Sequence, residues 1–502
     1  MNKFFSILLS GKGFPVLTTL ALVFFMTTAN GQESRILTLN DVIQIAAENS
    51  REMVSAKHRF RSSFWEYKTF RTQYYPMLNL NTTMPGINKS IQKYTNADGT
   101  ETFITRSMAN YSMDLSLSKI IGFSGGQLFV NSGLERVDNF SNPTTTDYLS
   151  NPISIGLNQP VLAYNPYRWD NKIEPLKYKE AKQKFLEERE QVSISAITFF
   201  FDQLQSTISM KIAETNQANY DTLYKIAKGR YNLGKIAENE LLQLELSFLQ
   251  ARAQVDNAKL ELEMNTFKLK SFLRISEKTD LTLFPPAGFL STKADLPKAL
   301  IEARANRADT YSYDRKMKEA ESQVMQAKLQ NRFNANLFVQ YGLTATAADY
   351  SDVYKDPQEG QLLSFGIQIP ILDWGQAKGK IRMAESNREL VQTTVEQQEI
   401  DFEQEVFLKV MQFNMQQNQV NIAAKADTVA QKRFYVTKQR YLIGKIDITD
   451  LNIAQTESDN ARLSYISALR TLWRSYYELR RLTLYDFAID KPIDFNFSSV
   501  AW

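Results

Sequence analysis

The sequence predicts an α+β protein built from two similar halves, in which very long paired helices accompany short sets of alternating strands. Two observations support this prediction. A nine-residue stretch at 228–236 returns at 438–446 with six identical positions, and each copy lies between two long helical patterns. In both halves, strands with alternating apolar and polar residues precede the long helices, which is typical of a sheet with one apolar face.

Each copy of the repeated stretch predicts a tight reversal between two helices. Gly234 and Gly444 can adopt a positive φ, where any side chain would clash. Arg230 and Arg440 then fall in the last turn of the incoming helix, where the helix dipole favours a cation. Asp447 follows the second glycine, where the next helix needs a capping residue.

Composition excludes several classes of protein. A hydrophobic content of 43% with a mean hydropathy of −0.35 rules out both a polytopic helical membrane protein and a largely disordered chain. Lys3 and Lys12 precede an apolar run at 14–26, which predicts a signal peptide over residues 1–31. Removing these two lysines from the 59 basic residues leaves 57 against 55 acidic ones, so nucleic acid is not an expected partner.

Catalytic and metal chemistry is not expected. Cysteine is absent and His58 is the single histidine, so a thiolate or histidine-rich metal site is excluded. His58 lies beside Lys57 and Arg59 and is expected on an exposed helix face. The sequence contains no nucleophile elbow, zinc motif or phosphate loop, so we expect no catalytic residue and no cofactor.

The first half, residues 32–284, is predicted to hold a complete set of elements. The longest helix, of some 65 residues, would reach ~95 Å at ~1.5 Å per residue, which requires a coiled coil or a bundle. The predicted elements are a helix over 38–75, strands within 77–160, a helix over about 166–230, a turn with its tip at 230–236, and a helix over about 237–273.

The second half, residues 298–484, repeats this order after a linker at 285–297. Its long helix carries a heptad seam of apolar residues, which indicates a helix packed along a neighbour: Val395, Phe402, Val406, Phe413 and Val420. A tail over 485–502 is expected to be extended on the outside. The predicted elements are a helix over 296–332, strands within 333–372, a long helix, a turn with its tip at 440–446, and a helix ending near 484.

The first half carries 47 residues that the second lacks. Matching residues are 257 positions apart in the initial helices, as for Ala46 and Ala303, but 210 apart at the end of the strands, as for Pro160 and Pro370. The additional residues lie between Tyr75 and Pro160 and resemble an added strand pair. That pair could either join the sheet or cover one end of it.

One chain offers only four to six strands, which is too few for a closed barrel. In hydrocarbon, unpaired N–H and C=O groups at a sheet edge cost several kcal/mol each, and about eight strands are the minimum for a single-chain barrel. If these strands span a membrane, several copies must contribute to one cylinder, and their long helices to a tube. Polar positions such as Ser112, Asp114, Ser116 and Gln368 would then face a wet lumen.

The duplicated arrangement resembles the TolC-like outer-membrane efflux protein family, also called outer membrane factors. Two features carry the resemblance: Arg-Tyr-x-x-Gly before a helix restart, which occurs twice, and the strand-to-helix passage from Ile367 to Gly375. The resemblance covers the chain from about Ile36 to Leu484.

The resemblance implies a homotrimer in the outer membrane, in contact with its lipid. The implied fold is a long α-helical coiled-coil barrel with a shared transmembrane β-barrel, internally duplicated and closed only as a trimer. The implied function is the exit duct of a tripartite efflux or secretion system, which receives substrates from an inner-membrane pump and a periplasmic adaptor.

The resemblance also implies roles for individual residues. Glu240 and Asp450 match acids that narrow the end of the tunnel, although helix-start stabilisation explains them equally well. A second acid expected three residues after Asp450 is Ile453, and an arginine often found two residues after the second glycine is Ile446. The hairpin turns would form the adaptor-contacting tip through Arg230, Leu233, Gly234, Arg440, Ile443 and Gly444.

Two other classes of protein explain the sequence less well than an export duct. A structural coiled-coil protein of the cell envelope would explain the helices, but not two sets of alternating strands that end in a proline at matching places. A periplasmic enzyme would need a catalytic motif, and acidic residues on helices are usually solvated. The sequence leaves the cargo open among drugs, metals and proteins, because a duct's cargo is selected mainly upstream.

Overall fold

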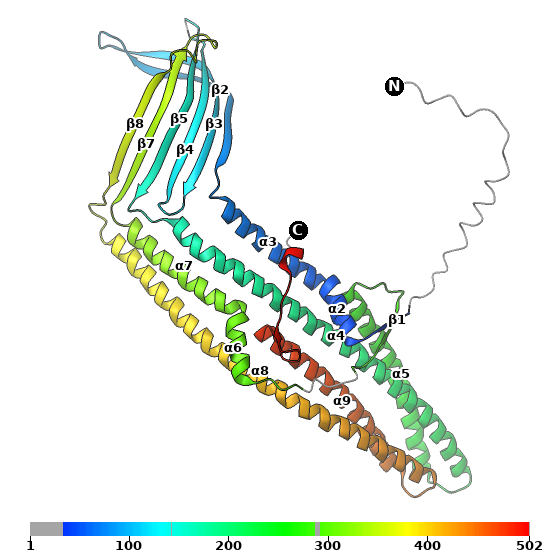
Figure 1. Ribbon diagram of the computed structural model, residues 1–502. Coiled ribbons are helices and arrows are strands. Elements are labelled where there is room, and N and C mark those ends of the chain that lie inside the picture. The colour runs from blue at the N-terminus through cyan, green and yellow to red at the C-terminus, as the bar shows by residue number, and fades with distance from the viewer. Residues whose placement is uncertain (1–33, 142, 287–291, 501–502) are drawn as a thin grey trace, which may run out of the picture. The chain divides into compact units, whose positions relative to one another are not determined.

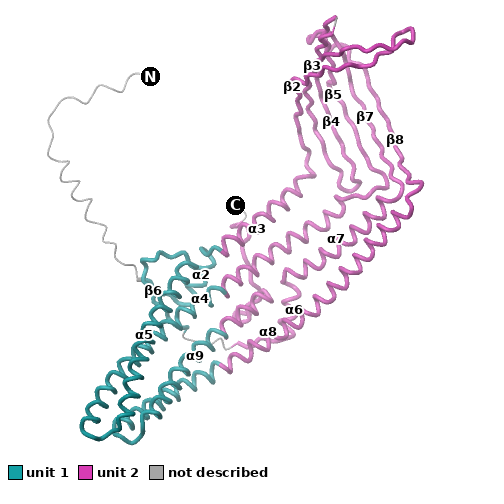
Figure 2. The backbone as a smooth tube through the Cα atoms, turned by 180° about the vertical axis from the view of Figure 1, so that it is seen from behind, with its two compact units in different colours: residues 1–51, 195–289, 420–471 teal, residues 52–194, 290–419, 472–502 magenta. Residues whose placement is uncertain are grey.

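The computed structural model in Figure 1 describes residues 34–500, apart from residue 142 and residues 287–291. The predicted signal peptide at 1–31 and part of the predicted linker at 285–297 lie outside the described residues. The chain forms two compact units (Figure 2). Unit 1 contains residues 1–51, 195–289 and 420–471, and unit 2 contains 52–194, 290–419 and 472–502.

Four long helices have matching lengths in the two halves. α4 (Pro166–Asn232) and α8 (Gln376–Leu442) each contain 67 residues, and α5 (Glu238–Leu273) and α9 (Ile448–Thr483) each contain 36. At ~1.5 Å per residue the longer pair spans ~100 Å each. The division into repeats at 32–284 and 298–484 stays a prediction, which these equal lengths support.

Side chains fix where these helices begin. At the start of α4 the Asn165 Oδ1 accepts a hydrogen bond from the Arg168 backbone N–H (3.3 Å), and Pro166 occupies the first helical position, where no N–H is needed. At the start of α8 the Asp373 carboxylate accepts hydrogen bonds from the N–H groups of Gly375 (3.0 Å) and Ala377 (2.9 Å). These hydrogen bonds lower the pKa of Asp373.

The initial helix of each half was predicted as one element, and that prediction is wrong. The helix predicted over 38–75 is divided into α2 (Leu39–Asn49) and α3 (Arg51–Thr72), and the one over 296–332 into α6 (Leu296–Asn306) and α7 (Ala308–Gln330). One extended residue causes each break: ψ is 149° at Ser50 and 146° at Arg307. A single extended residue leaves the polarity pattern unchanged, so periodicity did not indicate it.

The start of unit 1 is a capped helix beside a small parallel sheet. Thr38 and Asp41 form a capping box, in which the Thr38 side chain accepts from the Asp41 N–H and the Asp41 side chain accepts from the Thr38 N–H. β1 (Ser34–Leu37) pairs in parallel with β6 (Asp280–Leu283). The apolar residues Val42 and Ala46 of α2 are fully buried.

The main sheet of unit 2 is antiparallel, with six strands in the order β2-β3-β4-β5-β7-β8 (Figure 1). All four strands between residues 77 and 161 lie in this sheet, so the added strand pair joins it and does not cover its end. The strands are β2 (Met77–Thr95), β3 (Glu101–Ile121), β4 (Gly126–Asn139), β5 (Thr145–Val161), β7 (Asn334–Ala347) and β8 (Gln358–Gln368).

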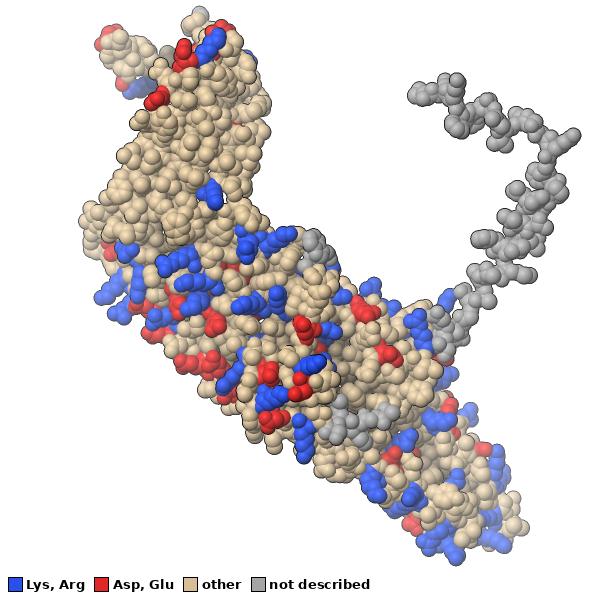
Figure 3. All heavy atoms as spheres, in the orientation of Figure 1, with Lys and Arg blue, Asp and Glu red and all other residues tan. Residues whose placement is uncertain are grey.

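The two faces of the sheet differ in polarity, as the alternation predicted. Leu117 of β3 lies opposite Leu78 of β2 and Val130 of β4, and the apolar side chains on this face are largely exposed. On the other face the Ser116 hydroxyl donates to the Asn131 Oδ1 (2.6 Å). Figure 3 shows few charged side chains over the middle of the sheet on the side drawn.

The end of β8 differs from the prediction. The alternation predicted a strand through Ile371, but β8 ends at Gln368. Pro370 has no N–H to donate to a neighbouring strand, and Ile371 is 95% exposed. Within the described part of the chain, no strand pairs with the outer edge of β2 or with that of β8.

The predicted heptad seam of α8 is buried at all five positions. Residues at further steps of seven, Phe434 and Tyr441, are half-buried and buried respectively, so the seam continues to the end of the helix. His58 is exposed on α3, as expected. No described helix is long and apolar enough to cross a membrane.

We expect Gly342→Ala to destabilise the pairing of β5 with β7 by about 1–3 kcal/mol, the usual effect of overpacking. A Cβ at Gly342 would lie 2.6 Å from the Ser154 Cβ and 2.9 Å from the Ile153 carbonyl oxygen, and backbone cannot move away cheaply. Thermal unfolding followed by circular dichroism measures the effect. Gly366→Ala is the control, because nothing lies within 4 Å of its Cβ position. Equal midpoints for the two variants would contradict the prediction.

Candidate functional site

The two helical hairpins of unit 1 are joined by turns of the same geometry. In the first turn Gly234 has a φ of +70°, its N–H donates to the Tyr231 carbonyl (2.8 Å), and the Lys235 N–H donates to the Arg230 carbonyl (2.9 Å). This pair of hydrogen bonds is the Schellman motif, which closes a helix through a left-handed residue.

The second turn, between α8 and α9, repeats this arrangement. Gly444 has a φ of +73°, its N–H donates to the Tyr441 carbonyl (2.9 Å), and the Lys445 N–H donates to the Arg440 carbonyl (3.0 Å). The positive φ expected of both glycines is therefore confirmed. The cap of the following helix also agrees with expectation, because the Asp447 Oδ1 accepts from the Asp450 N–H (3.0 Å), whereas Ala237 offers no side-chain cap to α5.

A shared apolar core connects the two hairpins. Ile236 and Ile446, which follow the lysine of each turn, pack against this core and are half-buried. The first hairpin therefore contacts the second directly through side chains from all four helices. The buried members of the core are Leu223, Ala227, Leu244, Tyr441, Ile448 and Leu451.

One arginine makes the two hairpins different. The Arg230 Nη2 donates to the Leu442 carbonyl (2.7 Å), and its guanidinium carbon lies 6.0 Å from the centroid of the Tyr441 ring. Leu442 is the last residue of α8, where carbonyls lack a partner within the helix. Arg440 is exposed, and among the described residues it donates no side-chain hydrogen bond to the first hairpin.

The predicted constriction acids lie in different surroundings. Glu240 is half-buried near Tyr441, where burial first, and then the Glu240 charge, raise the pKa of the Tyr441 phenol against the opposing effect of Arg230. The structure thus brings Arg230, Glu240 and Tyr441 together. Asp450 is exposed in the first turn of α9. Whether either acid narrows a tunnel stays a prediction.

The most exposed predicted tip residues are apolar. Leu233 is 74% exposed and Ile443 is 66% exposed, and each directly precedes the glycine of its turn. Apolar side chains held at the closed end of a rigid turn are suited to contact a partner surface. The role of the six predicted tip residues in binding an adaptor stays a prediction.

Sequence reasoning missed a set of polar contacts between the two hairpins. The Asn216 amide donates to the Asp459 carboxylate (2.7 Å), and the Tyr220 hydroxyl donates to the Asn452 Oδ1 (2.9 Å). The Lys438 ammonium also donates to Asn219 (2.7 Å). The four-residue and seven-residue spacings of these side chains on α4 and α9 were the signal that could have indicated a shared polar face.

Asp459 is the half-buried acid of this set. Burial raises the pKa of its carboxyl group, and hydrogen bonds from Asn216 and Gln455 partly oppose that effect. A carboxyl with a raised pKa binds its proton more tightly in the folded protein than in the unfolded chain.

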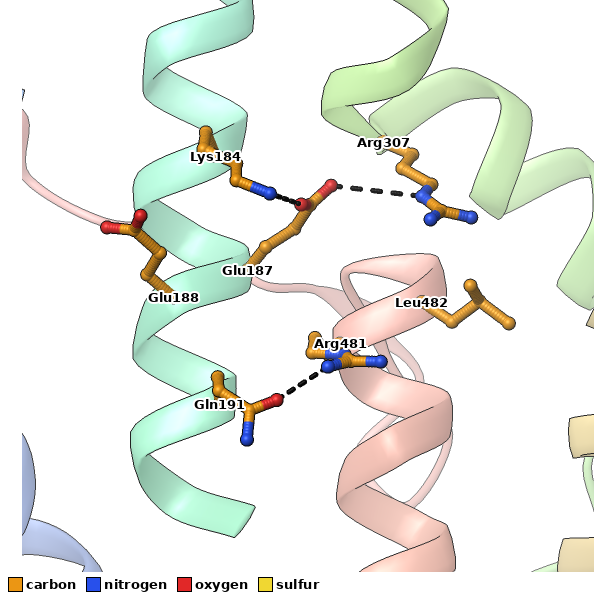
Figure 4. Close-up of a pocket in the computed structure, with 7 residues that line it drawn as sticks. All are labelled: Lys184, Glu187, Glu188, Gln191, Arg307, Arg481 and Leu482. Atoms are coloured by element: carbon orange, nitrogen blue, oxygen red, sulfur yellow. Dashed lines mark hydrogen bonds and ion pairs between the residues drawn. The ribbon is translucent and has the colours of Figure 1, made fainter. Parts of the chain in front are cut away.

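Unit 2 contains a cavity of about 310 Å³ beside α4 (Figure 4). Glu187 lies 3.4 Å from Lys184 and 4.0 Å from Arg307, and burial raises the pKa of its carboxyl group. These charges satisfy one another, and in the described part of the chain no cluster of three or more His, Cys, Asp or Glu residues could hold a metal. The cavity is lined by Lys184, Glu187, Glu188, Gln191, Arg307, Arg481 and Leu482.

The uncovered apolar face of the sheet and the paired helical hairpins define the class of protein. An uncovered apolar sheet together with long paired helices is typical of an outer membrane channel. Residues 299–483 match the outer membrane efflux protein family, which is a family of transport ducts and not of enzymes. A search of curated proteins finds no match.

Solved structures of outer membrane channels share this fold. The Campylobacter jejuni CmeC channel is 15% identical with a TM-score of 0.66, over 92% of this chain and 89% of that chain. The VceC outer membrane protein of Vibrio cholerae is 13% identical with a TM-score of 0.60, over 91% and 97%. The open state of the Neisseria gonorrhoeae MtrE channel is 15% identical with a TM-score of 0.52, over 91% of each chain.

The family resemblance predicted from the sequence is thereby confirmed, together with the fold class and the location in the outer membrane. Residues 299–483 match the outer membrane efflux protein family, and the whole chain shares the fold of solved outer membrane channels. The match at 299–483 falls in the second half of the chain, which contains the second hairpin and two of the six strands.

We expect Arg230→Ala to loosen the second turn, because the Leu442 carbonyl loses a charged donor that contributes about 1.5–3 kcal/mol. Amide hydrogen exchange in the segment 441–446 should then be faster by about tenfold or more. Arg440→Ala is the matched control, since that side chain is exposed. The assignment fails if both variants show the exchange rates of the wild type.

We expect the Asp459 carboxyl to make stability depend on pH. Because its folded pKa is raised, its contribution is complete below the ordinary carboxyl pKa of 3.8 and is lost as the pH rises through the folded value. The thermal midpoint of the wild type should therefore fall more between about pH 4 and pH 7 than that of Asp459→Asn. An equal fall in the two proteins would show that Asp459 has no such effect.

Proposed function

We propose that this protein is the exit duct of a tripartite efflux or secretion system, formed by three copies of the chain. In this proposal the sheets of the copies close into one transmembrane barrel, and their long helices form a tunnel in the periplasm. Substrates arrive from an inner-membrane pump through a periplasmic adaptor, and the duct itself performs no chemistry.

The six-stranded sheet is the observation that carries this proposal. Its apolar face is exposed along its length, and among the described residues both edges lack a partner strand. In lipid, unpaired N–H and C=O groups at a sheet edge are too costly to persist. In water, a sheet with an unpaired edge and an exposed apolar face aggregates. Further copies of the same chain satisfy both requirements, because each copy offers one β2 edge and one β8 edge.

The helices of unit 1 support the same arrangement. α8 carries a second apolar seam at steps of seven, through Ile422, Val429 and Val436, and all three side chains are exposed. This seam lies two residues, or about 200°, from the buried one, so it faces the opposite side of the helix. A helix that is apolar on two opposite sides suits a tube wall with a neighbour on each side.

The hairpin turns are proposed as the end of the tunnel that meets the adaptor. Leu233 and Ile443 offer the apolar contacts, while Gly234 and Gly444 set the turns that present them. Arg230 holds the second hairpin against the first, and we propose that Arg440 remains available to a partner. In the same proposal, Glu240 and Asp450 narrow the tunnel just inside these turns.

Opening of the duct would then be a movement of one hairpin relative to the other. Hydrogen bonds between the hairpins resist this movement. Arg230, Asn216 and Tyr220 donate from the first hairpin to the second, and Lys438 donates from the second to the first. Each hydrogen bond contributes only about 0.5–1.5 kcal/mol net, more where a charge takes part, so adaptor binding can offset their loss. A purely structural coiled-coil protein would need neither these breakable contacts nor an uncovered sheet.

We expect the double variant Leu233→Asp/Ile443→Asp to abolish export while trimers still form. Both side chains are exposed on the protomer and lie at the turns, so the charges remove partner contacts without disturbing the core. Export is measured in a deletion strain by ethidium accumulation, metal tolerance and the secreted proteins. Trimers are measured by light scattering in detergent.

Asn239→Asp is the control, because it adds a charge near the first turn at an exposed polar residue. Full export by the double variant would remove the tip assignment. A deletion strain with unchanged tolerance and secretion under all conditions would contradict the duct itself.

A further inference from the structure

The added strand pair of the first half gives the sheet a feature that the proposed function does not specify. We propose that β2 and β8 form the seam between neighbouring copies, so that six strands from each of three copies make a barrel of 18 strands. This inference rests on the proposed trimer. It assigns the interaction surface on each side of the chain, and the partner at both surfaces is a second copy of the chain.

Within the described part of the six-stranded sheet, the hydrogen-bond ladder leaves these two edges available. β4 pairs with β3 from Gly126 through Asn139 on one side, and with β5 on the other, so neither β4 nor β3 has a free edge along this length. Detaching the β2–β3 hairpin to expose β4 would break the entire β3–β4 ladder. The seam can therefore form at β2 without any loss of existing pairing.

The lipid-facing surface also continues through the added pair. Leu78 and Leu80 of β2 lie opposite Leu117 and Leu115 of β3, on the same face as Leu128 of β4. All five of these leucine side chains are more than two-fifths exposed, and no acidic residue lies between them on this face. A hairpin that only covered the end of the barrel would have no need for an apolar face in register with that of β4.

The direction of the strands allows the ring to close. The six strands alternate in direction, so β2 and β8 at the two edges run antiparallel to each other. A β8 edge can therefore pair with the β2 edge of the next copy in the same antiparallel sense as every other pair. The register of β2 and β3 shifts between Thr83 and Gly86, so we place the test of the seam in the regularly paired segment 77–83.

A barrel of 18 strands differs in kind from a small one. Barrels of about eight strands are filled by side chains, whereas those with 16–18 strands enclose an aqueous channel. The face toward the lumen carries polar groups such as Asn79, Asn81, Asp114 and Ser116. The barrel would thus pass bulky, hydrated cargo, and any size limit would lie elsewhere along the duct.

Disulfide scanning tests the seam directly, because the natural chain contains no cysteine. Asn79, Asn81 and Thr83 of β2 are each changed to Cys and combined with Cys at Leu362, Ser364 or Gly366 of β8. All six positions lie on the face that carries the polar groups, so no assumption about register is needed. The full chain is oxidised in its membrane and analysed on non-reducing gels.

We expect at least one β2–β8 combination to give covalently linked dimers and trimers, while Asn131→Cys of β4 with the same β8 positions gives none. Links between β4 and β8 in a trimer would overturn the 18-strand barrel but leave the duct intact. A protein that remains monomeric would instead overturn the proposed trimer. Electron cryo-microscopy of the wild type in lipid nanodiscs provides a second test, and any strand count other than 18 would contradict the inference.

Discussion

The structure depends on a sheet that cannot complete its own hydrogen bonding. Each strand inside the six-stranded sheet is paired on both sides, but β2 and β8 each retain one free edge within the described chain. The apolar face beside these edges is exposed, with Leu363 of β8 exposed to 73%. A membrane removes the cost of the exposed face, and only further strands remove the cost of the edges. The family match at 299–483 and the shared fold of solved outer membrane channels agree with this requirement.

The helical hairpins show how two similar sequence stretches come to make different contacts. Both turns have the same Schellman geometry, and both carry an exposed apolar residue before the glycine. Arg230 nevertheless contacts the end of the other hairpin through the Leu442 carbonyl, whereas its counterpart Arg440 is exposed. One hairpin thus contacts the other through polar side chains. This difference is what a gate built from two similar parts would need.

Sequence patterns predicted most of this fold because they act locally. The positive φ of Gly234 and Gly444, the buried seam of α8 and the alternating strands each depend on residues a few positions apart. The breaks at Ser50 and Arg307 were not predicted, since one extended residue leaves the polarity unchanged. The contact of Arg230 with Leu442 spans 212 positions, and so does not show in any local pattern. The sequence also left open whether the added strands join the sheet, and only the observed strand pairing decides it.

The mass of the purified protein in solution tests the central claim most directly. If a single chain cannot close its sheet, light scattering in detergent should give three chains per particle, and removal of detergent should cause aggregation. A monodisperse, water-soluble monomer that persists without detergent would contradict the account.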